Sequence, residues 1–325
     1  MPYLETAKTY KGNDVEKIFF RPMLTGPSAA DLGIRVLYNL PAPTTVQYWT
    51  PYRNILQPLD GSGWNGGKGA SKLQKTIPME RVKAELAFSA ADYYSMVYET
   101  ITAQPDVNFE DLTGTIIEQA ETAIFKQNIA ENLRVTMWIG DTQNTQGYNT
   151  FNGLLSHIKV FKEDEVFEPV IYSAQDKQDP SFIPKLFDDL WNQLHVDAQS
   201  AKHEGQLAFF VTSDIYNLYE KYLDSMGVDA AYTGTVEGRT ELMYHGIPVI
   251  DTRLSRYLME TTFDQSFALL TDRRNLILAV NTADMPGNEV RMWYNPDEME
   301  NRQRATFMAG TAILDEHLFS YAYIE

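Results

Sequence analysis

Apolar residues recur at two different spacings along the chain. Between Leu112 and Met137 they recur at three- and four-residue steps, which predicts an amphipathic helix. Asn108 precedes this run as an N-cap with acidic residues after it, and Gly140 ends it. At ~1.5 Å per residue, a helix over 108–139 has a length of about 45 Å. We expect this helix to be a strut that extends beyond one small domain.

Period-two alternation predicts strands near both ends of the chain. Residues 81–89 alternate charged and apolar side chains, and residues 302–309 show the same alternation. Phe319, Tyr321 and Tyr323 then occupy alternate positions. If the late strands pair with the early one, the chain between them is an insertion between two halves of one domain.

Helical and strand patterns alternate between these two halves. Residues 181–194 follow a helical pattern, and a strand leads into a second helix capped by Ser213 or Asp214. Apolar runs typical of buried strands occupy 206–211, 246–250, 267–270 and 276–280. This alternation predicts a compact α/β unit from about residue 165 to 287.

The N-terminal part has a different character. The first 45 residues mix short apolar runs with prolines, among them Pro22, Pro27, Pro41 and Pro43, which indicates an extended, peripheral arm. Strand-like segments at 45–50 and 72–77 then flank a glycine-rich stretch, which predicts a long hairpin. Five glycines within residues 61–69 leave few side chains to bury, so we expect the tip to order only on contact.

Composition narrows the classes of function. The 27 basic and 44 acidic residues give a formal net charge of −17, which argues against sequence-specific nucleic-acid binding and keeps a concentrated protein soluble. Cysteine is absent, which excludes disulfides, thiolate catalysis and cysteine-held metals. The chain has no apolar run of about 18 residues and no signal-peptide layout, so we expect neither a membrane span nor secretory export.

The motifs that spell known chemistry fail in their context. Residues 61–66 spell GxGxxG, but the glycines that follow and Pro78 prevent the helix that a dinucleotide site requires. A phosphate-binding P-loop fails because Gly69 follows Lys68 where Ser or Thr is needed. The five histidines have no metal-site spacing. We therefore predict no catalytic, cofactor-binding or metal-binding residue, and no cofactor.

The hairpin supplies the candidate contact residues instead. Tryptophan, tyrosine and arginine dominate binding hot spots, and glycine neighbours cannot bury Trp64 locally. For Tyr48 and Trp49, packing at the hairpin base is an equally good explanation. The predicted contacts with another subunit are Trp49, Tyr52, Arg53, Gly61, Gly63, Trp64, Gly66 and Lys68.

The order of these elements resembles the tailed-bacteriophage major capsid protein family, which has the Hong Kong 97 fold. Local stretches similar to the family are the strand-to-helix step at 209–214, the Gly-Ile-Pro-Val strand within 244–249, and a hairpin at 269–277. The resemblance implies an α+β fold with an N-terminal arm at 1–44 and an extended loop at 45–78. The implied peripheral domain comprises 79–164 and 288–325, with a spine helix at about 108–139, and the axial α/β domain comprises 165–287.

The resemblance also implies a function without chemistry. The chain is expected to be a major capsid protein that forms hexamers and pentamers of itself in the icosahedral shell of a virion. The shell would be assembled in the host cytoplasm and would enclose double-stranded DNA without sequence-specific binding. Separate scaffold, portal and decoration proteins are the expected partners. Two alternatives stay open: an encapsulin-like compartment shell, and a carboxylate- or metal-dependent hydrolase that gathers several of Asp251, Asp264, Asp272 and His245.

Overall fold

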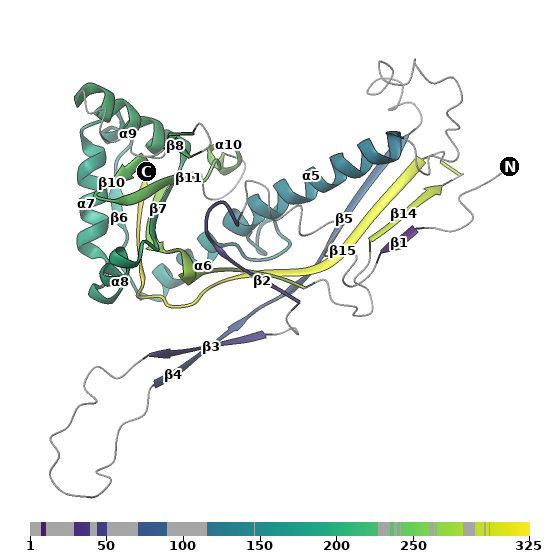
Figure 1. Ribbon diagram of the computed structural model, residues 1–325, viewed down its shortest axis with the longest axis horizontal. Coiled ribbons are helices and arrows are strands. Elements are labelled where there is room, and N and C mark those ends of the chain that lie inside the picture. Colours follow the sequence, from purple (N-terminus) through teal and green to yellow (C-terminus); the bar gives the residue numbers. More distant parts are fainter. Residues whose placement is uncertain are drawn as a thin grey trace, which may run out of the picture.

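A computed structural model shows two six-stranded β-sheets joined by one long helix (Figure 1). The structure describes residues 8–10, 29–39, 44–50, 71–89, 116–145, 147–226, 235–236, 239–240, 242–259, 263, 265–281, 290–295, 297–298 and 300–325. Among these residues, no helix is long and apolar enough to cross a membrane.

The first sheet is built around one long strand, β15 (Glu300–Ile313). Its antiparallel neighbours are β5 (Glu80–Ser89), β14 (Val290–Asn295) and β13 (Leu276–Asn281). The pairing of β15 with β5 confirms that the late strand joins the early one. Burial alternates along β15 from Glu300 to Ala309, as period two requires for a strand with one covered face.

Two short strands complete this sheet. Strand β1 (Lys8–Tyr10) pairs with β14, and β2 (Arg35–Tyr38) runs parallel to β13. Just before β2, Ala29 and Ile34 are buried in the main core. The expectation that the first 45 residues are peripheral is therefore wrong for 29–38, where apolar side chains between the prolines are numerous enough to pack.

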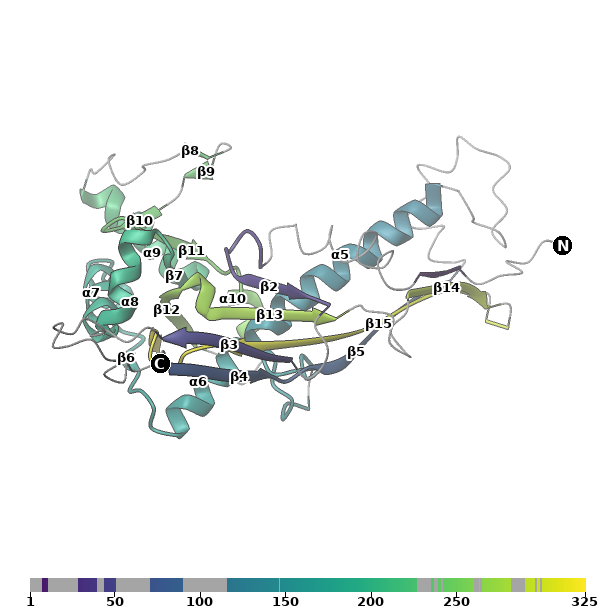
Figure 2. The same cartoon turned by 60° about the horizontal axis from the view of Figure 1, so that its bottom comes forward.

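Helix α5 (Ile116–Ile139) is the predicted strut. Along the helix, Phe125, Ile129 and Leu133 pack in the same core as the covered face of the first sheet. At its C-terminal end, the ring of buried Trp138 lies 5.5 Å from that of Phe210 in the second sheet. The helix thus spans both sheets (Figures 1 and 2). Its predicted first turns, residues 108–115, lie outside the described residues.

The second sheet contains six strands in the order β10-β11-β7-β12-β16-β6. These strands are β10 (Leu242–Tyr244), β11 (Ile247–Asp251), β7 (Leu207–Val211), β12 (Ser266–Asp272), β16 (Phe319–Ile324) and β6 (Val170–Tyr172). Helices α7 (Phe182–Gln193) and α9 (Ser213–Met226) share one apolar core with this sheet. Both helices and the strand-to-helix step from β7 to α9 agree with the sequence prediction.

Shorter elements complete the described chain. They are helices α6 (Leu154–Glu163), α8 (Val196–Ser200) and α10 (Ser255–Leu258), the 3-10 turns Asp176–Gln178, Ala201–Glu204 and Arg273–Asn275, and the two-stranded pair β8 (Thr235–Val236) and β9 (Arg239–Thr240). Helix α6 follows α5 and shares its core. Most of these elements lie on the side of the second sheet (Figure 1).

The predicted hairpin at 269–277 is wrong, because β12 and β13 do not pair with each other. Strand β12 belongs to the second sheet and pairs with β16, whereas β13 belongs to the first and pairs with β15. Two antiparallel strands therefore pass together from one sheet to the other. At the crossing point, the Asn275 side chain donates to the Asp315 carbonyl (3.0 Å) and accepts from the Asp315 amide (2.8 Å).

This crossing also bears on the predicted domain limits. Strand β13 falls within the range 165–287 but lies in the first sheet, and β16 falls within 288–325 but lies in the second. Strand pairing thus crosses both limits, because each chain segment leaves one sheet for the other near Asn275 and Asp315. The division of the chain into domains stays a prediction.

Candidate subunit interface

The hairpin formed by β3 (Thr44–Thr50) and β4 (Ser71–Ile77) projects from the body of the protein (Figure 1). The strands are antiparallel, with Thr44 opposite Ile77 and Trp49 opposite Lys72. Thr45, Gln47, Gln74 and Thr76 are exposed. Paired backbone with mostly polar, exposed side chains makes this segment an arm, not a part of the core.

A single side chain anchors the base of this arm. Ile77 is completely buried in a small cluster with Ile277 and Ala279 of β13 and Ala312 of β15. Gly310 on β15 permits this packing, because a Cβ atom there would lie 2.0 Å from the carbonyl oxygen of Pro78. The base of the hairpin is thereby held against one face of the first sheet.

A second contact links the arm to α6. The Lys75 ammonium of β4 lies 5.2 Å from the ring centroid of Phe161. Nearby on α6, the Nε2–H of His157 donates to the carbonyl oxygen of Thr311 (3.0 Å). Burial lowers the pKa of His157, and the positive charge of Lys75 lowers it further. His157 is therefore neutral at pH 7.

The predicted contact residues lie almost entirely beyond the described part of the hairpin. The backbone of Trp49 is in β3, but its side chain is outside the described residues. Also outside are Tyr52, Arg53, Gly61, Gly63, Trp64, Gly66 and Lys68. Their role in contact with another subunit stays a prediction.

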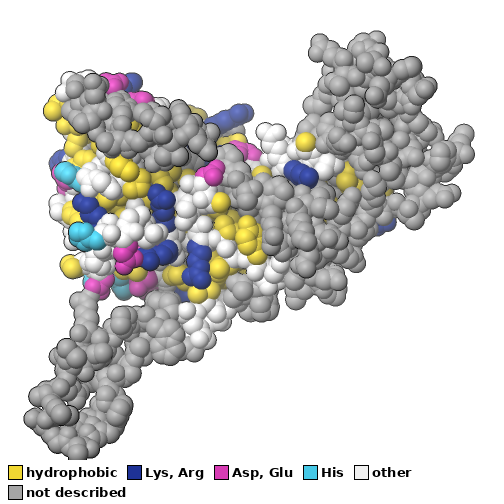
Figure 3. All heavy atoms as spheres, viewed as in Figure 1, with side chains coloured by type: hydrophobic (Ala, Val, Ile, Leu, Met, Phe, Trp, Pro, Cys, Tyr) yellow, Lys and Arg dark blue, Asp and Glu magenta, His cyan; other side chains and the backbone are white. Residues whose placement is uncertain are grey.

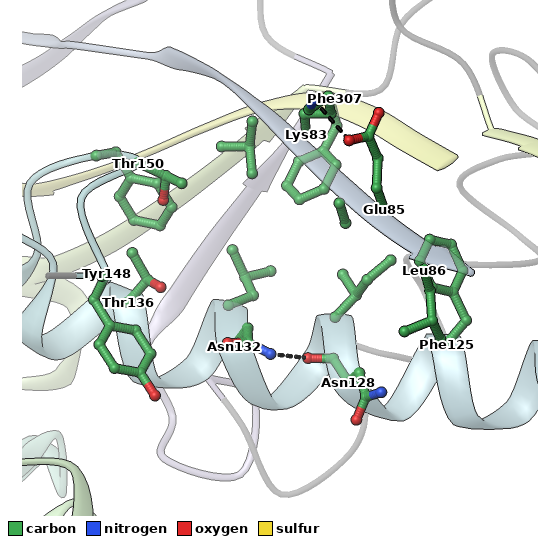
Figure 4. A pocket seen from close by; sticks show the side chains of 16 residues that line it. Lys83, Glu85, Leu86, Phe125, Asn128, Asn132, Thr136, Tyr148, Thr150 and Phe307 are labelled. Atoms are coloured by element: carbon green, nitrogen blue, oxygen red, sulfur yellow. Dashed lines mark hydrogen bonds and ion pairs between the residues drawn. The ribbon is translucent and has the colours of Figure 1, made fainter. Parts of the chain in front are cut away.

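Helix α5 and strand β5 enclose an apolar groove of about 510 Å³ on the body of the protein (Figure 4). Phe125, Ile129 and Leu133 line it from α5, and Val82 and Phe307 line it from the sheet. Lys83 and Glu85 lie on the side of β5 away from α5 (Figure 4). The lining offers shape and apolar surface but no cluster of titratable groups.

A buried cation fixes α5 to the second sheet. Arg134 is 9% exposed; its Nη1 donates to the carbonyl oxygen of Thr252 (2.7 Å), directly after β11. Its guanidinium also pairs with Glu131, which accepts a hydrogen bond from Tyr257 (2.8 Å). Arg134 is the main cause that lowers the pKa of Glu131. The i-to-i+3 spacing predicts that Glu131 and Arg134 pair on one helix, but it does not reveal the contact of Arg134 with Thr252.

Two residues of the hydrolase alternative, Asp251 and Asp272, lie apart. Asp251 is level with Val211 on β7 and Asp272 is level with Leu207, which separates them by about 13 Å along the strands. Asp251 accepts a hydrogen bond from Ser213 (2.8 Å), and Asp272 pairs with Arg274 (2.6 Å).

Of the other two members of that set, the structure describes only His245. His245 packs edge-on against the ring of Tyr244, and Asp264 lies outside the described residues. Within the part of the chain that the structure describes, no three His, Asp or Glu side chains are grouped as metal ligands. On the face in Figure 3, histidines and charges of both signs are scattered among apolar side chains.

Comparisons with known proteins give matches only to structures. No protein-family model and no curated protein sequence match this chain. A solved chain of the satellite phage P4 procapsid, which includes the size determination protein, matches with a TM-score of 0.57 and 10% identity over 94% of this chain and 98% of that chain. A chain from the capsid of an empty GTA particle matches with a TM-score of 0.51 and 12% identity over 93% and 91%.

The chain has the Hong Kong 97 fold. The resemblance to tailed-phage major capsid proteins is thereby confirmed at the level of the fold. In terms of the Hong Kong 97 fold, the β3–β4 hairpin corresponds to the expected extended loop and α5 to the expected spine helix. The second sheet with α7 and α9 supplies the α/β part. Sequence identities of 10–12% carry the likeness no further than the fold.

Proposed function

We propose that this chain is a non-enzymatic subunit of a closed protein shell, the major capsid protein of a tailed phage. The observation that supports this most strongly is the match in fold to two capsid chains over almost their full lengths. Shells of this kind are built from many copies of one chain, so the expected partner is the chain itself, in hexamers and pentamers. The shell would enclose double-stranded DNA in the virion, after assembly with separate scaffold, portal and decoration proteins in the host cytoplasm.

The projecting hairpin supports self-association. A two-stranded arm whose exposed side chains are polar gains little from standing alone in water, because an isolated hairpin is marginally stable. Its base is nevertheless fixed by Ile77 in a closely packed cluster. A fixed base gives the arm a defined direction, which is the property that a contact with a neighbouring copy needs.

The experiment is shell assembly by a variant that lacks residues 61–69. We expect the native chain to form shells visible by electron microscopy and the deletion variant to stay in small species on size-exclusion chromatography. A control variant replaces the same nine residues with a glycine-serine linker of equal length. If the linker variant also fails, side chains such as Trp64 are required, whereas its success shows that reach is enough. Normal shells from the deletion variant refute the role of the arm.

The encapsulin-like alternative has the same fold and differs in contents. Shells purified from the producing cells distinguish the two functions: co-purifying DNA supports a virus, and a co-purifying protein cargo supports a compartment. A small monodisperse species under all conditions contradicts both shell functions.

A further inference from the structure

One face of the first sheet gathers basic side chains. On β15, Arg302 and Arg304 point to the opposite side from buried Gln303 and Ala305. The antiparallel register places residues of β5 and β14 beside them on the same face, with Glu85 and Arg291 level with Arg304. We call this surface the basic face; its residues are Arg81, Lys83, Glu85, Arg291, Trp293, Glu300, Arg302, Arg304, Thr306 and Met308.

The basic face is the side of the sheet that α5 leaves open. Phe307, Ala305 and Val290 point the other way into the core that contains α5. The side chains of Lys83 and Arg304 are 53% and 41% exposed, and Arg81 and Arg291 are exposed as well. The strands therefore present this row of cations to the surroundings.

Carboxylates on the face neutralise only part of its charge. Glu85 pairs with both Lys83 (2.7 Å) and Arg304 (3.1 Å), and Arg302 pairs with Glu300 (3.3 Å) and with Glu298. Five basic side chains and three acidic ones, with Glu298 counted beside Arg302, leave the face at +2. Because the whole chain carries −17, everything else in it sums to −19. The face is thus a local reversal of sign on a strongly acidic protein.

The chemistry of the face favours a protein partner over a nucleic acid. The Arg291 guanidinium lies 5.5 Å from the ring centroid of Trp293, and Met308 lies opposite Arg81. Tryptophan, methionine and arginine are the residue types enriched in protein interfaces. A surface that only holds phosphates needs cations and hydrogen-bond donors, and gains nothing from Trp293 or Met308.

The location of the face favours a second copy of this chain as that partner. The hairpin base packs on the same side of the sheet, where Ala312 of β15 contacts Ile77. A copy that the hairpin reaches therefore lies on the side that carries the basic face. Acidic subunits repel one another, so a positive surface on a −17 subunit offers a neighbouring copy an attractive contact.

We propose that the basic face docks onto an acidic surface of a second copy and thereby overcomes the repulsion between subunits during assembly. This inference rests on the proposed shell function. It assigns to the sheet a contact separate from the tip of the hairpin, and it makes assembly depend on the sign of a few side chains.

The test compares two double variants with equal net charge. Arg81→Glu with Arg291→Glu reverses two cations on the face, and Lys185→Glu with Lys221→Glu reverses two exposed cations on α7 and α9. Both change the formal charge from −17 to −21. We expect the face variant to raise the concentration needed for shell assembly at least roughly tenfold at low salt, and the control to assemble much as the native chain does.

A graded series guards against misfolding. The milder Arg81→Gln with Arg291→Gln should give an intermediate shift, while circular dichroism and the unfolding midpoint stay native. Native assembly by the Glu variant overturns the proposal, and so does an equal defect in both Glu variants, which makes net charge the cause. The proposal is also overturned if the native subunit binds duplex DNA in a gel-shift assay and the face variant loses this binding but assembles normally. If the native chain forms no shell, the proposed function fails and this inference falls with it; failure of the inference alone leaves native shells intact.

Discussion

The anchor of the hairpin allows a quantitative prediction. Ile77 is fully buried against Ile277, Ala279 and Ala312. Ile77→Ala removes three carbon atoms, which at about 0.8 kcal/mol each cost about 2.4 kcal/mol of transfer free energy. The cavity left between two rigid strands adds to this, so we expect a total loss of about 3 kcal/mol. Val46 is half-buried beside the same cluster, so Val46→Ala should lower the free energy of unfolding by less than Ile77→Ala does.

The assay separates local from global loss. Urea unfolding of the unassembled subunit measures the total change, and amide hydrogen exchange over residues 71–77 measures opening of the hairpin base. Thr45→Ala, at an exposed position of β3, is the control and should change neither. A loss below about 1 kcal/mol with unchanged exchange in Ile77→Ala would show that the cluster does not hold the arm.

Three further predictions follow from the same contacts. Gly310→Ala places a Cβ 2.0 Å from the carbonyl oxygen of Pro78, so we expect a loss of about 1–3 kcal/mol in urea unfolding and faster exchange at the hairpin base. In Arg134→Met, the Thr252 carbonyl and the Glu131 carboxylate lose the guanidinium that they contact, and we expect the free energy of unfolding at pH 7 to fall by about 1–3 kcal/mol. Because the pKa of Glu131 is lowered in the folded state, the stability that the ionised Glu131 contributes is present above pH 4.5 and is lost as pH falls through the lowered value. The difference in free energy of unfolding between the native chain and the variant should therefore be smaller at pH 3 than at pH 7. Because the pKa of His157 is lowered in the folded state, the unfolded chain takes up this proton first as pH falls below 6.5, and the free energy of unfolding should decrease there. In His157→Gln, we expect a smaller decrease in the free energy of unfolding between pH 8 and pH 5.

The pattern of apolar residues was enough to predict the long elements of the fold. In α5 apolar residues recur at three- and four-residue steps, and β5 and β15 each alternate over eight or more residues, so local sequence and tertiary packing agree. The path of β12 and β13 was not predictable in this way. A polar link such as Asp272 to Asn275 is compatible with a hairpin and with a crossing between sheets. The choice depends on Asp315, 40 residues later in the chain, which bonds to Asn275.

The candidate site was predicted less completely than the fold. Glycine content marked the tip of the hairpin, but the anchor Ile77 is one apolar residue at the end of a strand and has no sequence signal of its own. The basic face did have a signal, since Arg302 and Arg304 alternate with uncharged residues just as Arg81 and Lys83 do. Combining the two pairs into one surface requires the register of β5 with β15, and sequence periodicity does not give the register between strands.

The joints between the two sheets decide where a shell of these subunits can vary in shape. Three links resist movement of one sheet against the other: Arg134 to Thr252, the ring of Trp138 against Phe210, and Asn275 to Asp315 at the crossing strands. Each would have to break or slide if the body bent, whereas the described contacts of the β3–β4 arm are one small cluster and the Lys75–Phe161 contact. We therefore expect pentamers and hexamers to differ in the direction of the arm and in contacts between copies, with the two sheets moving as one body. Electron cryomicroscopy of the assembled shell tests this: a rotation between the two sheets that breaks the Arg134–Thr252 bond in one class of subunit would contradict it.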